Sequence, residues 1–187
     1  MAPSVFSVGP DGWVAPARRH PSPNCDARPT GTAISLVVIH NISLPPGCYG
    51  GVHVERLFTN GIEAGEHPIL DRLRDAKVSA HFFIDRAGGS MQFVSCLERA
   101  WHAGASSFKG RARCNDFSIG IELEGTDFEP FVDKQYVTLN ALLAALAAAF
   151  PLEAIVGHSD IALDRKTDPG PFFCWNRLDA PSHLLAR

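Results

Sequence analysis

Four histidines stand at the ends or edges of stretches that we expect to form β-strands: His40, His81, His102 and His158. Histidine is the commonest metal ligand in proteins, and rigid strand ends can hold several ligands in fixed positions. A carboxylate, Asp168, follows His158 after a polar loop. Two histidines with one carboxylate are a common catalytic zinc set, which leaves a coordination position for water. For any one of these histidines, the alternative is a hydrogen-bonded structural residue.

The stretch Phe117–Gly125 provides a second candidate for chemistry. Side chains alternate between the two faces of a strand, so Gly120, Glu122 and Glu124 share the face opposite an apolar one. Two carboxylates buried without partners would be costly. Either one of them is a catalytic acid or base with a raised pKa, or both are solvated on an exposed sheet face. A glycosidase pair is a further alternative, because glycosidases place two carboxylates around the bond.

Two cations, Arg165 and Lys166, precede Asp168 in a charged segment that ends in Asp-Pro-Gly-Pro. A cation beside a scissile carbonyl would stabilise a developing oxyanion. The alternative is a solvated run of charges. In both cases the Pro-Gly-Pro turn would hold Asp168 in place.

The composition excludes several classes of protein. The 187 residues fit one domain, and 17 Lys and Arg against 20 Asp and Glu give a net charge of -3. A nucleic-acid binder or a polybasic membrane-surface protein would normally be basic. The most apolar segment, residues 139–150, is too short to span a bilayer, so we expect a buried helix there. Five cysteines without a CxxC pair do not indicate a disulfide framework or a cysteine-rich zinc site.

The pattern along the chain predicts strands mixed with a few helices. Residues 1–33 indicate an irregular arm, and residues 61–77 and 101–115 indicate loops. No secretory signal is recognised near the first residues, so we expect a cytoplasmic protein. The mixture favours an α+β or mixed-sheet α/β domain with its chemistry on strand-end loops. Expected strands are 34–40, 78–88, 90–95 (paired with the preceding one across Gly88-Gly89), 117–125 and 153–158, and expected helices are 52–58, 133–150 and 175–185.

Five separated blocks, taken in order, resemble the N-acetylmuramoyl-L-alanine amidases. They are LVVIHNISLPPG, VSAHFFI, WHAGASS, GRARCNDFSIGIELEGTD and GHSDIALDRKTDPGP, within a match that runs from Trp13 to Trp175. The resemblance implies a single α+β domain with a central mixed β-sheet flanked by helices, like that of peptidoglycan recognition proteins. Residues 34–187 would form the amidase domain, and residues 1–33 would be an arm of that same domain.

The resemblance also implies roles for individual residues. One zinc ion per chain would be held by His40, His158 and Asp168. Glu122 would activate a water molecule and pass its proton to the leaving amine, while Lys166 would polarise the scissile carbonyl. Zinc lowers the pKa of a bound water to about 7, which makes hydroxide available near neutral pH.

Substrate contacts implied by the resemblance fall on Asn41, Trp101, Arg113, Arg165 and Lys77. Arginine suits the carboxylates of a peptide because its planar fork binds them in a bidentate manner. Lys77 stands where relatives carry arginine, so the charge is kept but the fork is lost. Trp101 would offer an apolar surface to a sugar.

The remaining histidines have weaker signals. His102 is expected to line the pocket or to orient a ligand, and His81 is expected to be a structural strand residue. No motif surrounds the others, which we expect on the surface: His20, His53, His67 and His183.

The implied activity is hydrolysis of the amide between 1,6-anhydro-N-acetylmuramic acid and L-Ala in cytoplasmic anhydro-muropeptides, a step of peptidoglycan recycling that the family links to β-lactamase induction. We expect a monomer with no nucleic-acid or membrane partner. Three alternatives stay open at this point. They are an amidase of the same fold acting on intact peptidoglycan, a non-catalytic peptidoglycan-binding module, and a glycosidase that uses Glu122 and Glu124.

Overall fold

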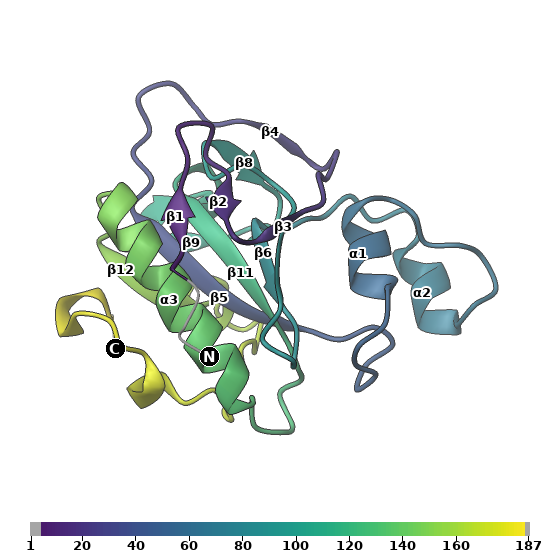
Figure 1. Ribbon diagram of the computed structural model, residues 1–187. Helices are drawn as coiled ribbons and strands as arrows, with labels where there is room; N and C mark the ends of the chain where they lie inside the picture. Colours follow the sequence, from purple (N-terminus) through teal and green to yellow (C-terminus); the bar gives the residue numbers. More distant parts are fainter. Residues whose placement is uncertain (1–4, 186–187) are drawn as a thin grey trace.

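Two long parallel strands form the centre of the molecule (Figure 1). They are β5 (Leu36–Ile42), which is rich in the β-branched residues that favour strands, and β11 (Ser118–Glu124), which contributes Ile119 and Ile121. All seven residues of β11 are buried. The computed structural model describes residues 5–185 of the chain. The expected arm and amidase domain therefore each extend slightly beyond the described residues.

The central sheet is mixed, as expected. Its strand order is β12-β5-β11-β6-β7-β3, and the first four strands run parallel. Strand β7 turns back antiparallel to β6 across Gly88-Gly89, which confirms the expected hairpin. The remaining members of the sheet are β12 (Ala154–Gly157), β6 (Phe82–Ile84), β7 (Ser90–Gln92) and β3 (Arg18–Arg19).

One face of the sheet packs against α3 (Asp133–Ala149), the longest helix among the described residues. The helix contributes Leu139, Leu142 and Leu146, which pack with Ile119 and Ile121 of β11. Its other side is exposed, so the apolar segment forms a half-buried helix rather than a fully buried one. No helix within residues 5–185 is both long enough and apolar enough to cross a membrane.

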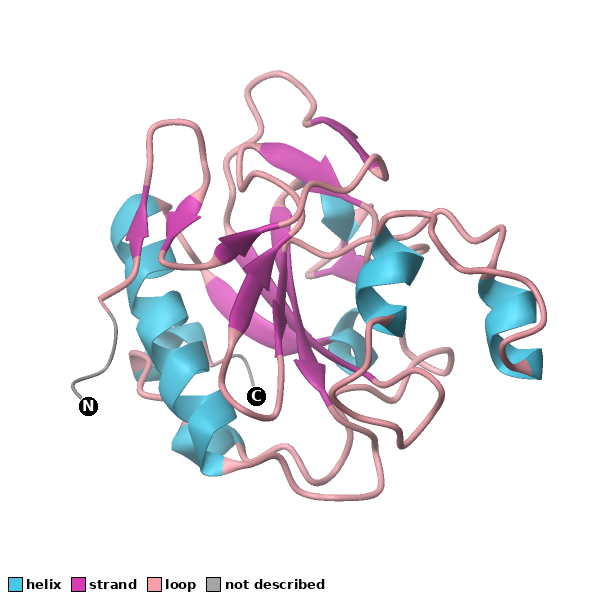
Figure 2. Cartoon of the chain, turned by 45° about the vertical axis from the view of Figure 1, so that its right-hand side comes forward, coloured by secondary structure: helices cyan, strands magenta, loops and turns pink. Residues whose placement is uncertain are grey.

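A second apolar cluster joins α1 (His53–Phe58) and α2 (Pro68–Leu73) to the β6–β7 hairpin. Figures 1 and 2 show these two helices on the side of the molecule away from α3. The expectation of a loop over residues 61–77 was wrong at α2. Pro68 starts this helix, the ring of His67 accepts a hydrogen bond from the amide of Ile69, and Leu70 is fully buried.

The N-terminal arm is more regular than its composition suggested. It holds a small hairpin, the edge strand β3, and a strand that pairs with the segment before Trp101. Such short strands carry too few residues for a visible alternation. The strands are β1 (Ser7–Val8), β2 (Val14–Ala15), β4 (Cys25–Ala27) and β8 (Glu98–Ala100).

Two other expectations need correction. Residues 101–115 contain a small hairpin of β9 (Ser107–Phe108) and β10 (Arg111–Ala112), followed by the 3-10 turn η1 (Cys114–Asp116). The expected C-terminal helix is instead two 3-10 turns, η2 (Trp175–Arg177) and η3 (Ser182–Leu184). Pro181 stands between them, and proline interrupts a continuous helix.

The register of the parallel strands determines where the candidate site residues lie relative to one another. Glu122 of β11 lies directly beside His40 of β5, and Gly157 of β12 lies beside Ile39. His158, which begins α4 (His158–Ile161), therefore emerges next to His40. The carboxyl ends of parallel strands meet at one edge of the sheet, where α/β proteins commonly bind ligands.

Candidate active site

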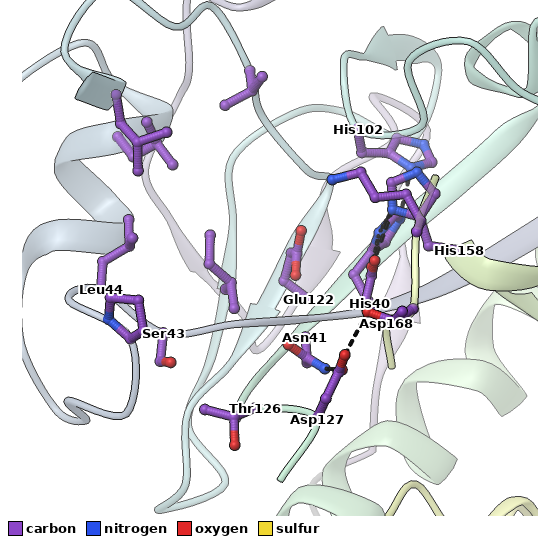
Figure 3. A pocket seen from close by; sticks show the side chains of 18 of the residues that line it. His40, Asn41, Ser43, Leu44, His102, Glu122, Thr126, Asp127, His158 and Asp168 are labelled. Atoms are coloured by element: carbon purple, nitrogen blue, oxygen red, sulfur yellow. Dashed lines mark hydrogen bonds and ion pairs between the residues drawn. The ribbon is translucent and has the colours of Figure 1, made fainter. Parts of the chain in front are cut away.

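His40, His158 and Asp168 converge at the carboxyl ends of β5 and β12 (Figure 3). The Nδ1 atoms of the two histidines are 3.0 Å apart, and Oδ2 of Asp168 is 3.0 Å from each of them. Both histidines are almost fully buried, and Asp168 is partly buried. Three potential metal ligands therefore surround one point.

The chemistry of this donor set fits a zinc ion. Ligand atoms about 2 Å from one ion lie a little over 3 Å from each other, which is close to the separations seen here. Burial lowers the pKa of His40 to about 4, so its ring is neutral and can offer a lone pair. Burial opposes ionisation of Asp168, but hydrogen bonds with His158 and His40 lower the pKa of its carboxyl below the usual range.

The Nε2 atoms of His40 and His158 also have hydrogen-bond partners. Nε2 of His158 lies 3.2 Å from the carbonyl oxygen of Ala103. Nε2 of His40 lies 2.9 Å from Nδ1 of His102, whose own Nε2 lies 3.1 Å from Oγ of Ser118. These contacts leave the Nδ1 atoms of His40 and His158 facing each other.

His40, His158 and Asp168, here called the metal-ligand cluster, line a cleft that Glu122 also lines, and Glu122 is 9% exposed. Its Oε2 atom is buried and has no hydrogen-bond partner among residues 5–185. Burial raises the pKa of Glu122 well above the ordinary value, the charge of Asp168 raises it further, and Lys166 lowers it. A carboxyl group that holds its proton this readily is suited to accept a proton from water and to return it.

Glu124 has a different environment, although it shares the face of Glu122. It is 4% exposed, and its carboxylate accepts hydrogen bonds from the backbone amides of Gly50, at 2.6 Å, and Arg86, at 3.0 Å. The two glutamates are therefore not a solvated pair. Glu124 fixes the loops at Gly50 and Arg86 through these two hydrogen bonds. It is not among the residues that line the cleft. This geometry does not support a glycosidase that uses both carboxylates.

The metal-ligand cluster opens into a cleft of about 810 Å³. Away from the cluster, one wall is apolar and comes from the segments around α1 and α2. That wall includes Leu44, Leu57, Phe58, Leu73, Ala76 and Val78. Such a cleft combines a polar reaction end with an apolar surface, as sites for small ligands usually do.

The structure brings most of the expected site residues to this cleft. Asn41, Trp101, Arg165 and Lys166 all line it, and Lys166 is solvent-exposed. The amide group of Asn41 also donates hydrogen bonds to Oδ1 of Asp127, at 2.6 Å, and to a backbone carbonyl.

Two expected substrate contacts are not brought into the cleft. Lys77 is exposed beside it, although its neighbours Ala76 and Val78 contribute to the lining. Arg113 is exposed and forms an ion pair with Asp116 at 3.2 Å.

Sequence reasoning missed the part that Asp127 plays. Its carboxylate accepts hydrogen bonds from the side chains of Asn41 and Thr167, so it joins β5 to the loop that carries Lys166 and Asp168. Asp127 is the last residue of one of the quoted sequence blocks. Nothing in that block distinguishes a carboxylate that positions a loop from a solvated one.

Outside the metal-ligand cluster, His81, His102 and the pair His67 and His183 lie as expected, but the expected surface position of His20 and His53 was only partly correct. His81 is fully buried, with Nδ1 accepting a hydrogen bond from the amide of Gly120 and Nε2 near the carbonyl of Glu98. His102 lines the cleft. His67 and His183 are exposed, whereas His20 and His53 are half-buried and contact glutamates.

Comparison with known proteins is consistent with this geometry. The family model for N-acetylmuramoyl-L-alanine amidase matches residues 30–171. The 1,6-anhydro-N-acetylmuramyl-L-alanine amidase AmpD of Citrobacter freundii is 52% identical over 172 residues, which cover 91% of this chain and 92% of that protein. A crystal structure of a selenomethionine derivative of AmpD matches with a TM-score of 0.88 and 49% identity, over 94% of this chain and 98% of the other.

A more distant structure contains a bound ligand. It is the N-acetylmuramyl-L-alanine amidase AmiD of Escherichia coli, in complex with the substrate anhydro-N-acetylmuramic acid-L-Ala-D-γ-Glu-L-Lys. The match has a TM-score of 0.59 and 28% identity, over 93% of this chain and 64% of that one.

Proposed function

This chain belongs to the N-acetylmuramoyl-L-alanine amidase family, and from that premise we propose that it hydrolyses the amide between 1,6-anhydro-N-acetylmuramic acid and L-Ala of anhydro-muropeptides. The resemblance inferred from the five sequence blocks is thereby confirmed, as is the expected α+β fold with a central mixed sheet. The observation that carries the proposal is the convergence of His40, His158 and Asp168 beside the buried Glu122.

We assign His40, His158 and Asp168 as the ligands of one zinc ion. Zinc bound there would polarise the substrate carbonyl and lower the pKa of a water molecule. Glu122 then takes a proton from the attacking water. Because burial holds its pKa high, the same carboxyl can return that proton to the departing L-Ala nitrogen.

Lys166 stabilises the charge that develops on the carbonyl oxygen. It lines the cleft in the loop that ends at Asp168, and its charge acts on both Glu122 and His40. A preorganised cation at this place acts where the transition state gains charge.

The cleft has suitable surfaces for the two parts of the proposed substrate. Trp101 and the apolar wall would contact the anhydro sugar, and Asn41 would hydrogen-bond near the scissile amide. Arg165 would meet a carboxylate of the peptide. Arg113 and Lys77 lie outside the cleft lining, so we assign them only to the outer part of a longer peptide.

The close relatives also support a biological role for this chain. AmpD proteins match nine-tenths of its length and are named for 1,6-anhydro-N-acetylmuramyl-L-alanine amidase activity. We infer that this chain acts in peptidoglycan recycling, as a monomer on cytoplasmic anhydro-muropeptides, without a nucleic-acid or membrane partner.

Product analysis tests the proposed function directly. Purified protein is incubated with anhydro-N-acetylmuramyl tripeptide and, separately, with intact peptidoglycan, each with and without a zinc chelator. We expect mass spectrometry to show free anhydro sugar and free tripeptide, and we expect the chelator to abolish both. Cleavage that survives the chelator would contradict the zinc mechanism, and efficient release of peptides from intact peptidoglycan would favour the lytic alternative.

A further inference from the structure

The ring of His102 lies behind His40, on the side away from the candidate metal position. Its Nδ1 atom is 2.9 Å from Nε2 of His40, and its Nε2 atom is 3.1 Å from Oγ of Ser118. The rings of His40 and His102 meet edge to face, with centroids 5.0 Å apart. Ser118, His102 and His40 therefore form a buried chain of hydrogen bonds that ends at a metal ligand.

Matching each hydrogen-bond donor to an acceptor gives the proton positions that go with metal binding by His40. A neutral His40 that offers Nδ1 to a metal carries its proton on Nε2, where it needs an acceptor. Nδ1 of His102 is that acceptor, so His102 carries its own proton on Nε2 and donates it to Ser118. His102 can therefore accept the proton of the His40 tautomer that carries it on Nε2, which is the tautomer competent to bind a metal through Nδ1.

Strand β11 has space for this ring because residue 120 is glycine. A Cβ atom at Gly120 would lie 2.5–2.8 Å from Cγ, Nδ1 and Cδ2 of His102. Carbon atoms do not approach this closely, so any larger residue at position 120 would displace the ring. The packing therefore fixes the place of His102 as well as its hydrogen bonds.

Ala103, which follows His102, contacts the other candidate histidine ligand, His158. The carbonyl oxygen of Ala103 accepts the hydrogen bond from Nε2 of His158. Oδ1 of Asn115 accepts hydrogen bonds from the backbone amides of both His102, at 3.2 Å, and Ala103, at 2.8 Å. One short segment, held by one amide side chain, thus contacts the outer nitrogens of both ligand rings.

We propose that the His102–Ala103 segment is the positioning element of the metal centre, with the His102 ring holding His40 and the Ala103 carbonyl holding His158 in their metal-binding tautomers and orientations. This inference rests on the metal site of the proposed function. Histidine ligands commonly donate their second N–H to a carboxylate, a backbone carbonyl or water. In this chain His158 follows that pattern, whereas His40 donates to another imidazole.

Two substitutions at position 102 separate hydrogen bonding from packing. In His102→Asn, the side-chain oxygen can take the place of Nδ1 as an acceptor, but the shorter side chain leaves a void. In His102→Leu, most of the volume is kept but the acceptor is lost. We expect His102→Leu to weaken zinc binding by about 10–100-fold and His102→Asn to stay close to wild type.

The measurement is a competition titration of the metal-free full-length protein with Zn²⁺ in the presence of a chromophoric chelator. Thermal unfolding of the same metal-free variants is recorded beside it. A role in packing alone would make zinc affinity follow thermal stability, with His102→Leu the better binder. That order, or an unchanged zinc affinity in His102→Leu, would overturn the proposal.

His81→Leu is the matched control. His81 is another buried histidine, its ring lies 5.8 Å from that of His102, and its hydrogen bonds go to backbone groups and Arg28 rather than to a metal ligand. We expect this variant to lose stability but to keep the zinc affinity of the wild type. A wild-type protein that binds no zinc in the titration would contradict the proposed function itself, which is a distinct result.

Discussion

Glu122 shows most clearly how one residue can be suited to catalysis at the expense of stability. Its Oε2 atom is buried and finds no hydrogen-bond partner in the described part of the chain, which is unfavourable in a folded protein. Glu124, two residues further on the same face, is equally buried but has two backbone donors. The contrast separates the structural glutamate from the one available to a substrate.

The first prediction concerns turnover in Glu122→Gln. The amide cannot take a proton from water, so we expect kcat to fall by about 10²–10⁴-fold, the usual contribution of a general base. Zinc content should stay at the wild-type level because Glu122 is not one of the three clustered ligands. Steady-state kinetics and metal analysis of the purified variant measure both quantities. Substantial turnover in a zinc-loaded variant would remove Glu122 from its assigned role.

A second prediction concerns the stability of that variant in metal-free protein. Because burial raises the pKa of Glu122, the folded state binds this proton more tightly than the unfolded state does. The resulting stabilisation is complete below the unfolded pKa and is lost as the pH rises through the folded pKa. At pH 7, Glu122→Gln should therefore be more stable than wild type by on the order of 1 kcal/mol.

Denaturant unfolding at several pH values measures this difference. The advantage of Glu122→Gln should disappear as the pH is lowered towards the ordinary glutamate value of 4.5. Glu124→Gln is the control, because its carboxylate accepts two backbone amides. That variant should lose stability at pH 7, and a gain there would contradict the distinction drawn between the two glutamates.

At the scale of elements, the apolar runs predicted β5, β11, β12 and α3 well, because long buried segments have clear patterns. The hydrophobic pattern does not specify which strands are neighbours in the sheet. The pairing of β5 with β11 is what places His40 beside Glu122. The ligand set and Glu122 came from the family resemblance rather than from spacing.

Short elements could not be predicted, for a physical reason. Helix α2 and the arm strands are defined by contacts with distant segments, and they are too short to show a period of their own. The same holds for the positioning contacts of His102 and Asp127, which depend on residues far away in the sequence. Whether Arg113 and Lys77 reach a substrate likewise depends on loop geometry that local sequence does not specify.

The N-terminal arm is joined to the sheet by Arg28. Its guanidinium donates hydrogen bonds to backbone carbonyls of Cys96, Asn115, Asp116 and Ser118. Burial lowers the pKa of Arg28 to about 10, so the side chain stays charged at neutral pH. One arm residue thus satisfies acceptors on two separate segments, at Cys96 and at residues 115–118.

The third prediction follows from these contacts. Arg28→Ala leaves several buried carbonyls without donors, so we expect a loss of about 3 kcal/mol or more in the free energy of unfolding. Chemical denaturation followed by circular dichroism measures it. Arg19→Ala, an exposed arm residue with an ion pair to Asp11 at 3.3 Å, should change stability by less than about 1 kcal/mol. Equal stabilities for the two variants would mean that residues 1–33 are not part of the cooperative domain.

At the scale of the whole molecule, the proposed metal centre depends on the complete fold. His40 is 118 residues from His158 and 128 residues from Asp168 along the chain, and their ligand atoms meet only after the parallel strands have paired. The unfolded chain has no such preformed site. Metal binding should therefore be coupled to global folding, because a ligand that binds only the folded state stabilises it.

The fourth prediction uses this coupling. Free zinc at 100 times its dissociation constant stabilises a folded protein by about 2.7 kcal/mol. For a chain of this size each kcal/mol corresponds to about 2–4 °C, so a chelator should lower the Tm of the zinc-loaded protein by about 5–10 °C. Differential scanning calorimetry with and without chelator measures the shift. His158→Ala removes one ligand, so its Tm should be the same under both conditions. An equal chelator effect in His158→Ala and wild type would place the stabilising metal elsewhere and refute the assigned ligand set.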